Sequence, residues 1–185
     1  MLTTEQKATL KADIEASVDP AVVAALGGGL VGRDDTTLAA IYNTASTFVA
    51  WRTDAPKSGI FTALAWKKMT PEDAPDGTTL WTNRSLACQG KQFVLQTMLI
   101  ADGATLDMSD NQVRTGIKDA IQDLPSGVNG ALQDAGWSAV KDVSTRFASR
   151  VEVLFAAGEG SQATPGNLDF QGTISIHDLG TAFNG

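Results

Sequence analysis

The sequence predicts a mainly α-helical protein, a bundle of about five helices with a small β-strand or hairpin near the C-terminus. Apolar residues return at helical spacing in several separate segments, and no regular alternation of strands with helices points to a doubly wound sheet. The spacing changes to a period of two only beyond Pro165, as in a strand with one apolar face. The apolar residues of this tail are Leu168, Phe170, Ile174 and Ile176. We therefore expect a helical domain over residues 1–160, with an irregular loop insertion at about 46–82, and a C-terminal β tail over residues 161–185.

The composition fits one folded domain. Of the 185 residues, 43% are hydrophobic and 19% are charged, so the chain can bury a sizeable core. The formal net charge is −7, from 14 basic and 21 acidic residues. Electrostatic nucleic-acid binding needs clustered lysines and arginines, so the composition argues against that class of protein.

Nothing in the sequence predicts export or membrane insertion. The N-terminal segment MLTTEQKATLKADIE lacks the basic and then apolar layout of a signal peptide. The most apolar run, residues 93–101, falls well short of the roughly 18 residues of a membrane span. The single cysteine, Cys88, cannot form an internal disulfide and fits a reducing compartment. We expect a soluble protein made in the cytoplasm.

The first 45 residues predict two helices. Thr3 and Gln6 form a capping box, and the helix that they begin ends near Asp19. Its apolar residues are Leu10, Ile14 and Val18. The short segment after it is compatible with a helical turn or an extended run. A second helix begins at Asp34 or Asp35, with an apolar face of Leu38, Ile41, Tyr42 and Ala45.

Residues 46–82 show no clear period. The segment 48–52, FVAWR, is predicted to be extended, and residues 60–69 are predicted to form a short helix. Three of the four tryptophans fall in this region: Trp51, Trp66 and Trp81. Large aromatic side chains in such a region either cover the edge of a core or anchor a partner. The core interpretation is favoured because large aromatic residues are mostly buried.

Two further helices follow in the middle of the chain. The first covers about residues 84–101, is capped by Asn83, and is expected to be central because its apolar stripe is broad. The stripe comprises Leu86, Gly90, Phe93, Val94, Leu95, Thr97, Met98 and Ile100. The second begins at a capping box of Ser109 and Gln112. Its apolar face is Val113, Ile117, Ala120, Ile121 and Leu124.

The longest predicted helix ends at Gly158. Its pattern is seen from Trp137 onward, and its start is expected near Asn129 or Gly130. Its apolar face is Val140, Ser144, Phe147, Val151, Leu154 and Phe155. Asp142 supports Arg146 from four residues away. Arg150 then needs an acidic partner of its own, which could be Glu159, Asp178 or a carboxylate on another subunit.

Three loops carry weak signals for ligand binding. Gly27, Gly29 and Gly32 spell GxGxxG, but no buried strand precedes them, and a flexible loop is the favoured interpretation. The segment GEGSQATPG (158–166) is not followed by GK[ST], so a helix stop and turn explains it. Asp102, Asp107 and Asp110 could offer oxygens to calcium. Their spacing does not match an EF-hand, and turns and helix caps use the same residues.

No group of side chains predicts catalysis. His177 is the only histidine and lies beside Asp178, an arrangement typical of an exposed turn. Cys88 is expected to be a buried, inert thiol. The carboxylate pairs Glu72–Asp73 and Asp34–Asp35 both fall in loops, where nothing separates their pKa values. We predict a protein that is not an enzyme, with no catalytic, cofactor-binding or metal-binding residues and no cofactor.

Three segments together resemble a family of small virion proteins encoded in the structural gene blocks of tailed bacteriophages. They are FVAWRTD (48–54), VRTGIKDAI (113–121) and TRFASRVEVLFAAGEGSQATPGNLDFQGTISIHDLG (145–180). The family pattern covers most of the chain, and its most specific part is LFAxGxGSxxxP followed by LxFxGxIS. This sequence departs from the pattern in a longer middle around residues 54–80 and in its triple glycine.

The resemblance implies a structural virion protein, a subunit of a phage neck ring (a head–tail connector or adaptor) that joins the portal to the tail. The adaptor ring, the tail terminator and another minor virion component all fit. The implied partners are copies of the chain in a homo-oligomeric ring, the portal, and neighbouring neck or tail proteins. DNA would pass through without specific binding, and no membrane is involved. The protein would be part of the virion, assembled in the host cytoplasm.

A C-terminal strand with an unpaired edge suits addition to a neighbouring subunit. The predicted interface residues are Arg146, Arg150, Leu168, Phe170, Ile174 and Ile176. The alternative function is a soluble small-molecule or metal-binding domain that uses the Gly27–Asp35 loop or the Asp102–Asp110 loop.

Overall fold

A computed structural model of the chain describes residues 1–27, 32–70, 79–126 and 131–184. The contacts divide the chain into two compact units. Unit 1 contains Met1–Ala50 and Phe147–Gly185, and unit 2 contains Trp51–Arg146. Each unit has a hydrophobic core of its own.

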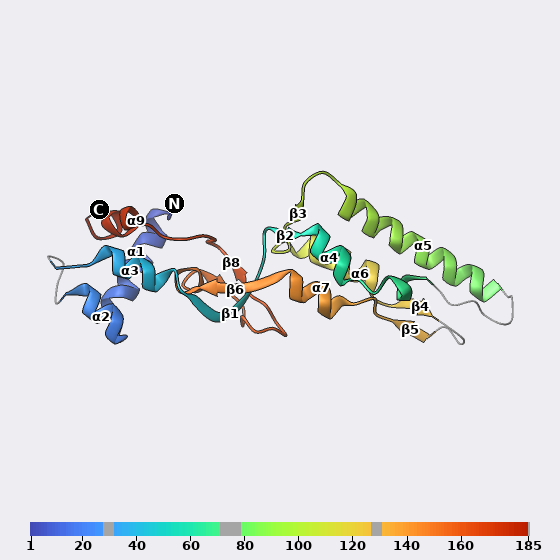
Figure 1. The fold of residues 1–185 in the computed structure, drawn as a ribbon, viewed down its shortest axis with the longest axis horizontal. Helices are drawn as coiled ribbons and strands as arrows, with labels where there is room; N and C mark the ends of the chain where they lie inside the picture. The colour runs from blue at the N-terminus through green and yellow to red at the C-terminus, as the bar shows by residue number, and fades with distance from the viewer. Residues whose placement is uncertain (28–31, 71–78, 127–130, 185) are drawn as a thin grey trace. The chain divides into compact units, whose positions relative to one another are not determined.

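Within the described residues the chain forms nine α-helices, one 3₁₀ helix and eight strands, which pair into four two-stranded sheets (Figure 1). The predicted bundle of about five helices with one C-terminal β element is therefore wrong, because small sheets occur along the whole chain. Six of the eight strands have only two or three residues. Strands this short cannot display an alternating pattern that stands out from helical periodicity.

Unit 1 begins with three helices. They are α1 (Thr4–Ala16), α2 (Pro20–Leu26) and α3 (Asp35–Tyr42). The predicted capping box of Thr3 and Gln6 is confirmed at the start of α1. Asp19 caps α2 and Asp34 caps α3, each by accepting a backbone N–H with its carboxylate. The segment for which the sequence left two conformations open is thus helical, since its cap and Pro20 at the first position both favour a helix.

The predicted long helix before Gly158 is wrong. Helix α7 (Trp137–Val143) ends at Ser144, the chain is extended as β6 (Thr145–Ser149), and helix α8 (Arg150–Val153) then starts anew. Strand β6 pairs with β1 (Ala45–Trp51), so the extended conformation predicted for residues 48–52 is confirmed. A capping box of Ser149 and Glu152 begins α8. Phe147, predicted to be buried, is 63% exposed on β6.

The C-terminal tail ends in a helix and not in a strand. After α8 it contains β7 (Ala156–Ala157), β8 (Asn167–Leu168) and α9 (Ile176–Asn184), and β7 and β8 are antiparallel. The predicted strand beyond Leu168 is therefore wrong. The Ser175 hydroxyl accepts the Asp178 N–H at 3.2 Å, and the Asp178 carboxylate accepts the Ser175 N–H at 2.9 Å. This reciprocal cap begins α9 within the segment whose alternation predicted a strand.

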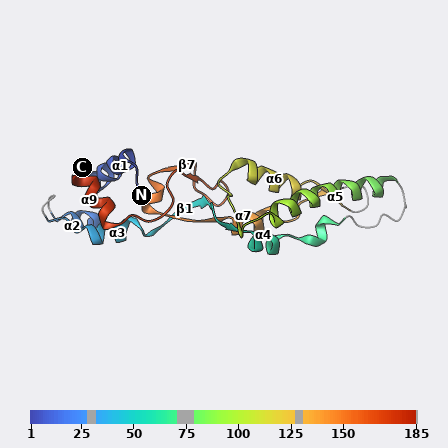
Figure 2. The ribbon, with the colours of Figure 1, turned by 90° about the horizontal axis from the view of Figure 1, so that it is seen from above.

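The two ends of the chain share the core of unit 1. Helix α9 packs against α1 and α3 (Figure 2). The fully buried large side chains of this core are Leu10, Ile14, Leu38, Tyr42 and Leu179. Residues 161–185 thus belong to the same compact unit as the first 50 residues.

Unit 2 contains the remaining elements. They are β2 (Ala55–Pro56), α4 (Lys57–Ala63), the 3₁₀ helix η1 (Trp66–Met69), α5 (Thr79–Ile100), β3 (Thr105–Leu106), α6 (Asn111–Ile121), β4 (Leu124–Ser126), β5 (Ala131–Gln133) and α7. Strands β2 and β3 pair antiparallel, as do β4 and β5. The predicted capping box of Ser109 and Gln112 is wrong by one residue, because Asp110 caps α6 by accepting the Gln112 N–H at 2.7 Å.

Helix α5 packs against α6, and α4 packs against α7. The core of unit 2 includes Ile60, Leu95, Met108, Ile117, Ile121, Leu124 and Val140. The predicted apolar face of α6 is confirmed at its centre, since Ile117, Ala120 and Ile121 are buried. None of the described helices combines the length and the apolar character needed to cross a bilayer.

Candidate functional site

An exposed apolar surface of unit 2 lies along α5. Leu86, Phe93 and Ile100 are 61%, 71% and 79% exposed, although they follow one another at seven-residue spacing on a single helix. Gly90 and Thr97 fall between them on the same line and are also exposed. We call these five residues the α5 stripe. The spacing is that of the a and d positions of a coiled coil.

The sequence predicted a broad buried face on α5 that included these five residues, and for them the prediction is wrong. It is confirmed for Leu95, which is fully buried. The buried side chains of α5 are Arg84, Cys88 and Leu95, on the other side of the helix. Both sides of α5 carry apolar residues, so periodicity alone could not decide which side meets the core. Cys88 Sγ lies 3.8 Å from the Pro125 carbonyl oxygen, which fixes that side against β4.

The α5 stripe is bordered by uncharged residues. Gln89, Val94 and Gln96 flank it. Lys91 is the only charged residue between Arg84 and Ile100, and its ammonium group donates to the Gln122 carbonyl oxygen at 2.5 Å. A chain with a net charge of −7 therefore presents a neutral apolar face along most of its longest described helix.

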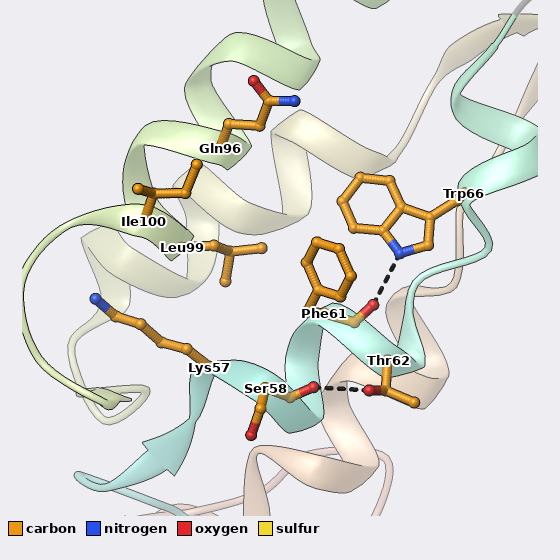
Figure 3. A pocket seen from close by; sticks show the side chains of 8 residues that line it. All are labelled: Lys57, Ser58, Phe61, Thr62, Trp66, Gln96, Leu99 and Ile100. Atoms are coloured by element: carbon orange, nitrogen blue, oxygen red, sulfur yellow. Dashed lines mark hydrogen bonds between the residues drawn. The ribbon is translucent and has the colours of Figure 1, made fainter.

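A hollow lies beside the C-terminal part of α5. Its volume is about 500 Å³, and we call it the α4–α5 hollow. It is lined by Lys57, Ser58, Phe61, Thr62, Trp66, Gln96, Leu99 and Ile100. In Figure 3 the three residues from α5 face Phe61 and Trp66 across the hollow. Ile100 belongs to both features, so the stripe and the hollow form one continuous surface.

Aromatic packing and a buried lysine shape the hollow. The rings of Phe61 and Trp66 lie 4.5 Å apart at 46°, and the indole N–H of Trp66 donates to the Phe61 carbonyl oxygen at 2.9 Å. Lys57, 8% exposed, donates to the Ala101 and Asp102 carbonyl oxygens at 2.5 and 3.3 Å. The lysine satisfies acceptors just beyond the C-terminus of α5, so the hollow keeps a mainly apolar lining.

Two tryptophans of the region 46–82 agree with the favoured interpretation, because Trp51 is in the core of unit 2 and Trp66 packs against it. Trp51, 7% exposed, is confirmed as a core residue. Its ring lies 6.2 Å from that of Trp137, and the Arg114 guanidinium lies 4.9 Å from its centre. Trp66 lines the hollow. The side chain of Trp81 lies outside the described part of the structure.

Two of the three carboxylates that could have offered a calcium site, those of Asp107 and Asp110, stabilise local structure. Asp107 accepts the backbone N–H of Ser109 at 2.9 Å as well as its hydroxyl. Asp110 caps α6. Among the described residues, no group of three or more histidine, cysteine, aspartate or glutamate side chains could hold a metal ion. Residues 28–31 of the glycine-rich loop, like Glu72 and Asp73, lie outside the described residues.

The single histidine and the single cysteine do not share a site with other reactive groups. His177 is exposed in the first turn of α9, and Asp178 beside it is occupied by Ser175. Burial raises the pKa of the Cys88 thiol, and this effect exceeds the opposing effect of Lys91. Cys88 is 1% exposed, which confirms the predicted buried thiol.

Arg150, one of the six predicted interface residues, bonds within unit 1. Its guanidinium donates to Asp19 at 2.6 Å and lies 4.6 Å from the centre of the Tyr42 ring. The hydrogen bond from Arg150 lowers the pKa of Asp19. Burial, reinforced by a hydrogen bond to Asp13, raises the pKa of Tyr42. The partner that the sequence required for Arg150 is thus Asp19, from a distant part of the chain.

The other predicted interface residues lie at different depths. Leu168 and Ile174 are buried, at 9% and 3% exposure. The rings of Phe170 and Phe155 meet edge to face at 5.9 Å. Ile176 is 53% exposed, and Arg146 is partly exposed. Whether any of them contacts another subunit stays a prediction.

The glycine-rich segment 158–166 is explained by packing against β1. Val49 N–H donates to the Gly160 carbonyl oxygen at 2.7 Å, and Gly166 N–H donates to that of Val49 at 2.9 Å. A Cβ atom at Gly160 or Gly166 would lie 2.1 or 2.4 Å from the Phe48 ring. The glycines therefore make room for an aromatic side chain. The predicted helix stop is wrong, because strand β7 and not a helix directly precedes Gly158.

No protein family, curated protein or solved structure matches the chain. The resemblance to phage virion proteins accordingly remains a prediction from the sequence motifs.

Proposed function

We propose that this chain is a non-enzymatic structural protein of a tailed-phage virion, a subunit of a neck ring that joins the portal to the tail. The observation that carries the proposal is the continuous apolar surface of unit 2, formed by the α5 stripe and the α4–α5 hollow. Exposed apolar patches of this kind mark contacts with other proteins. The virion context comes from the motifs in residues 48–54, 113–121 and 145–180.

The use of the polar side chains supports an assembly role. Asp107, Asp110 and Asp178 each accept hydrogen bonds that shape a turn or begin a helix. This use disfavours the alternative of a metal-binding Asp102–Asp110 loop. Part of the motif that carries the resemblance, around Gly160 and Gly166, likewise positions backbone around Phe48.

The acidic composition is compatible with a ring through which DNA passes. A net charge of −7 repels phosphate, so a channel lined by such subunits would not retain the DNA. The partners in this proposal are copies of the chain, the portal, and adjoining neck or tail proteins.

Deleting the gene from a phage genome that encodes the chain tests the proposal. Electron microscopy is expected to show DNA-filled heads and tails that are not joined, and expression of the chain in trans should restore complete particles. Normal particles from the deletion would refute the neck role. A melting temperature that rises on addition of calcium would instead favour the metal-binding alternative.

A further inference from the structure

We propose that α5 of one chain docks antiparallel against α5 of a second copy, with a two-fold axis at Phe93. The proposal rests on the proposed function, because it takes the occupant of the surface to be another subunit of the assembly. It adds which helix forms the contact, the direction of the pairing and its register.

The stripe is self-complementary about its centre. Leu86 lies seven residues before Phe93, and Ile100 lies seven residues after it. An antiparallel pair centred on Phe93 places Leu86 of each copy opposite Ile100 of the other, with the two Phe93 rings at the axis. The same residues thus serve both partners, as a two-fold interface requires.

Gly90 allows the two helices to approach closely. A Cβ atom at Gly90 would have no described atom within 4 Å, so none of the described residues requires a glycine there. A glycine inside a helix costs roughly 0.5–1 kcal/mol relative to alanine. Close approach of a second helix explains the glycine, because in this register Gly90 lies one turn from the axis, opposite Gln96 of the partner copy, and leaves room for that side chain.

The charge pattern favours a second copy over an acidic or basic partner. Two chains of net charge −7 repel each other over most of their surfaces. Along the stripe the flanking residues are Gln89, Val94 and Gln96, so two copies meet there without like-charge contacts. A partner chosen by charge would gain nothing from this face.

The area is sufficient for a weak dimer. Each exposed large apolar side chain offers on the order of 100 Å², so Leu86, Phe93, Val94 and Ile100 offer about 400 Å² per copy. The mouth of the α4–α5 hollow, with Phe61 53% exposed, brings the total for the pair to about 1,000 Å², the lower limit for a specific interface. We therefore expect a Kd on the order of 1–100 µM.

A two-fold contact closes on itself, so the ring contact would use a different surface.

Sedimentation of the full chain tests the contact. The wild-type protein should show a monomer–dimer equilibrium, and Phe93→Glu should raise the Kd by roughly 30-fold or more, as expected for a central aromatic residue. Leu132→Glu is the matched control, because Leu132 is 64% exposed on β5 of the same unit. It should change the Kd by less than about three-fold. A wild-type chain that stays monomeric at about 1 mM, or equal effects of the two variants, would overturn the proposal.

Disulfide trapping tests the direction of the pair. A mixture of Leu86→Cys and Ile100→Cys chains should form a crosslinked heterodimer under mild oxidation, because the two positions face each other across the axis. Leu86→Cys alone should not crosslink, and neither should the wild-type chain, whose Cys88 is buried. Crosslinking of Leu86→Cys with itself would indicate a parallel pair and refute the antiparallel register.

These results separate this proposal from the proposed function. A monomeric wild-type chain overturns the α5 pair even if the gene is required for joined particles. Normal particles from the gene deletion overturn the neck role even if the dimer and its crosslink are found.

Discussion

Replacing Gly160 with alanine is expected to lower the free energy of unfolding of unit 1 by about 2–4 kcal/mol. Gly160 has a φ of 66°, in the left-handed region. The added Cβ would lie 2.1 Å from Cδ2 of Phe48, so the ring or the loop must move. Because the Val49 N–H bonds to the Gly160 carbonyl oxygen, movement of the loop would also weaken its pairing with β1.

The magnitude has three parts. Left-handed backbone costs an alanine about 1–2 kcal/mol, and inserting a methyl group into a filled space costs about 1–3 kcal/mol. The smaller conformational freedom of alanine in the unfolded chain returns about 0.4–1 kcal/mol. These three contributions sum to a net loss of free energy of unfolding. The steric contribution comes from the contact with Phe48.

Three other glycines separate these parts. Gly172 has a φ of 130° but open space around its Cβ position, so Gly172→Ala should show the backbone cost alone. Gly166 would clash with Phe48 at 2.4 Å without a positive φ, so Gly166→Ala should show the steric cost. Gly90 has neither constraint, and Gly90→Ala should stabilise the single chain by about 0.5–1 kcal/mol.

Urea denaturation followed by circular dichroism measures the series. In a Phe48→Ala background the cost of Gly160→Ala should fall to about 1 kcal/mol, since only the backbone part remains. If Phe48→Ala leaves the cost of Gly160→Ala unchanged, the packing of Phe48 against the glycine segment is wrong.

Phe147→Ala is expected to cost less than about 1 kcal/mol because the ring is 63% exposed, whereas Ile174→Ala, at 3% exposure, should cost about 2–5 kcal/mol. Equal losses in urea denaturation would contradict the burial of Ile174. The pKa of Asp178 lies below its ordinary value of 3.8, because burial raises it but the hydrogen bonds from Ser175, the charge of the N-terminus and the hydrogen bond with the Leu2 backbone together lower it more. Its contribution to stability is therefore complete above about pH 4 and is lost as the pH falls through the lower folded pKa. The denaturation midpoints of wild type and Asp178→Asn should converge as the pH falls below about 4, and a constant difference would refute this. Arg84 is buried, and its Nε and Nη2 atoms have no hydrogen-bond partner among the described residues, so Arg84→Met should leave the melting temperature unchanged or raise it; a large fall would show that these nitrogens are paired.

Local signals in the sequence predicted helix starts well. The capping box of Thr3 and Gln6 and the cap at Asp34 depend on residues within one turn, and both are confirmed. The box of Ser149 and Glu152 follows the same S-x-x-E rule. This box lies inside the predicted long helix. It indicates that a new helix begins there, and therefore that the long helix is interrupted, as it is by β6.

Periodicity failed where tertiary contacts decide the outcome. The run from Val140 to Phe155 fits a helix, but its middle pairs with β1, about 100 residues earlier in the chain. The tail near Ile174 alternates like a strand, yet the cap of Ser175 and Asp178 begins a helix. No short-range pattern contains the information that β1 is available as a partner.

The candidate surface could be predicted only in part. The sequence identified the line through Leu86, Phe93 and Ile100 but assigned it to the core. The opposite face, with Cys88 and Leu95, is buried because α6 and β4 pack against it. The α4–α5 hollow depends on the distance between Trp66 and Ile100 in space, which no sequence pattern encodes.

The order of the two units along the chain has a consequence for synthesis on the ribosome. Unit 2 is one uninterrupted stretch, Trp51–Arg146, whereas unit 1 needs Met1–Ala50 together with Phe147–Gly185. Unit 2 can therefore complete its core first. At roughly 5–20 residues per second, the nascent helices α1 to α3 wait about 7–28 s for α9 to be synthesised. During that interval Leu10, Ile14 and Tyr42 lack the C-terminal half of their core, so a chaperone that shields nascent apolar segments would act on the first 50 residues rather than on unit 2.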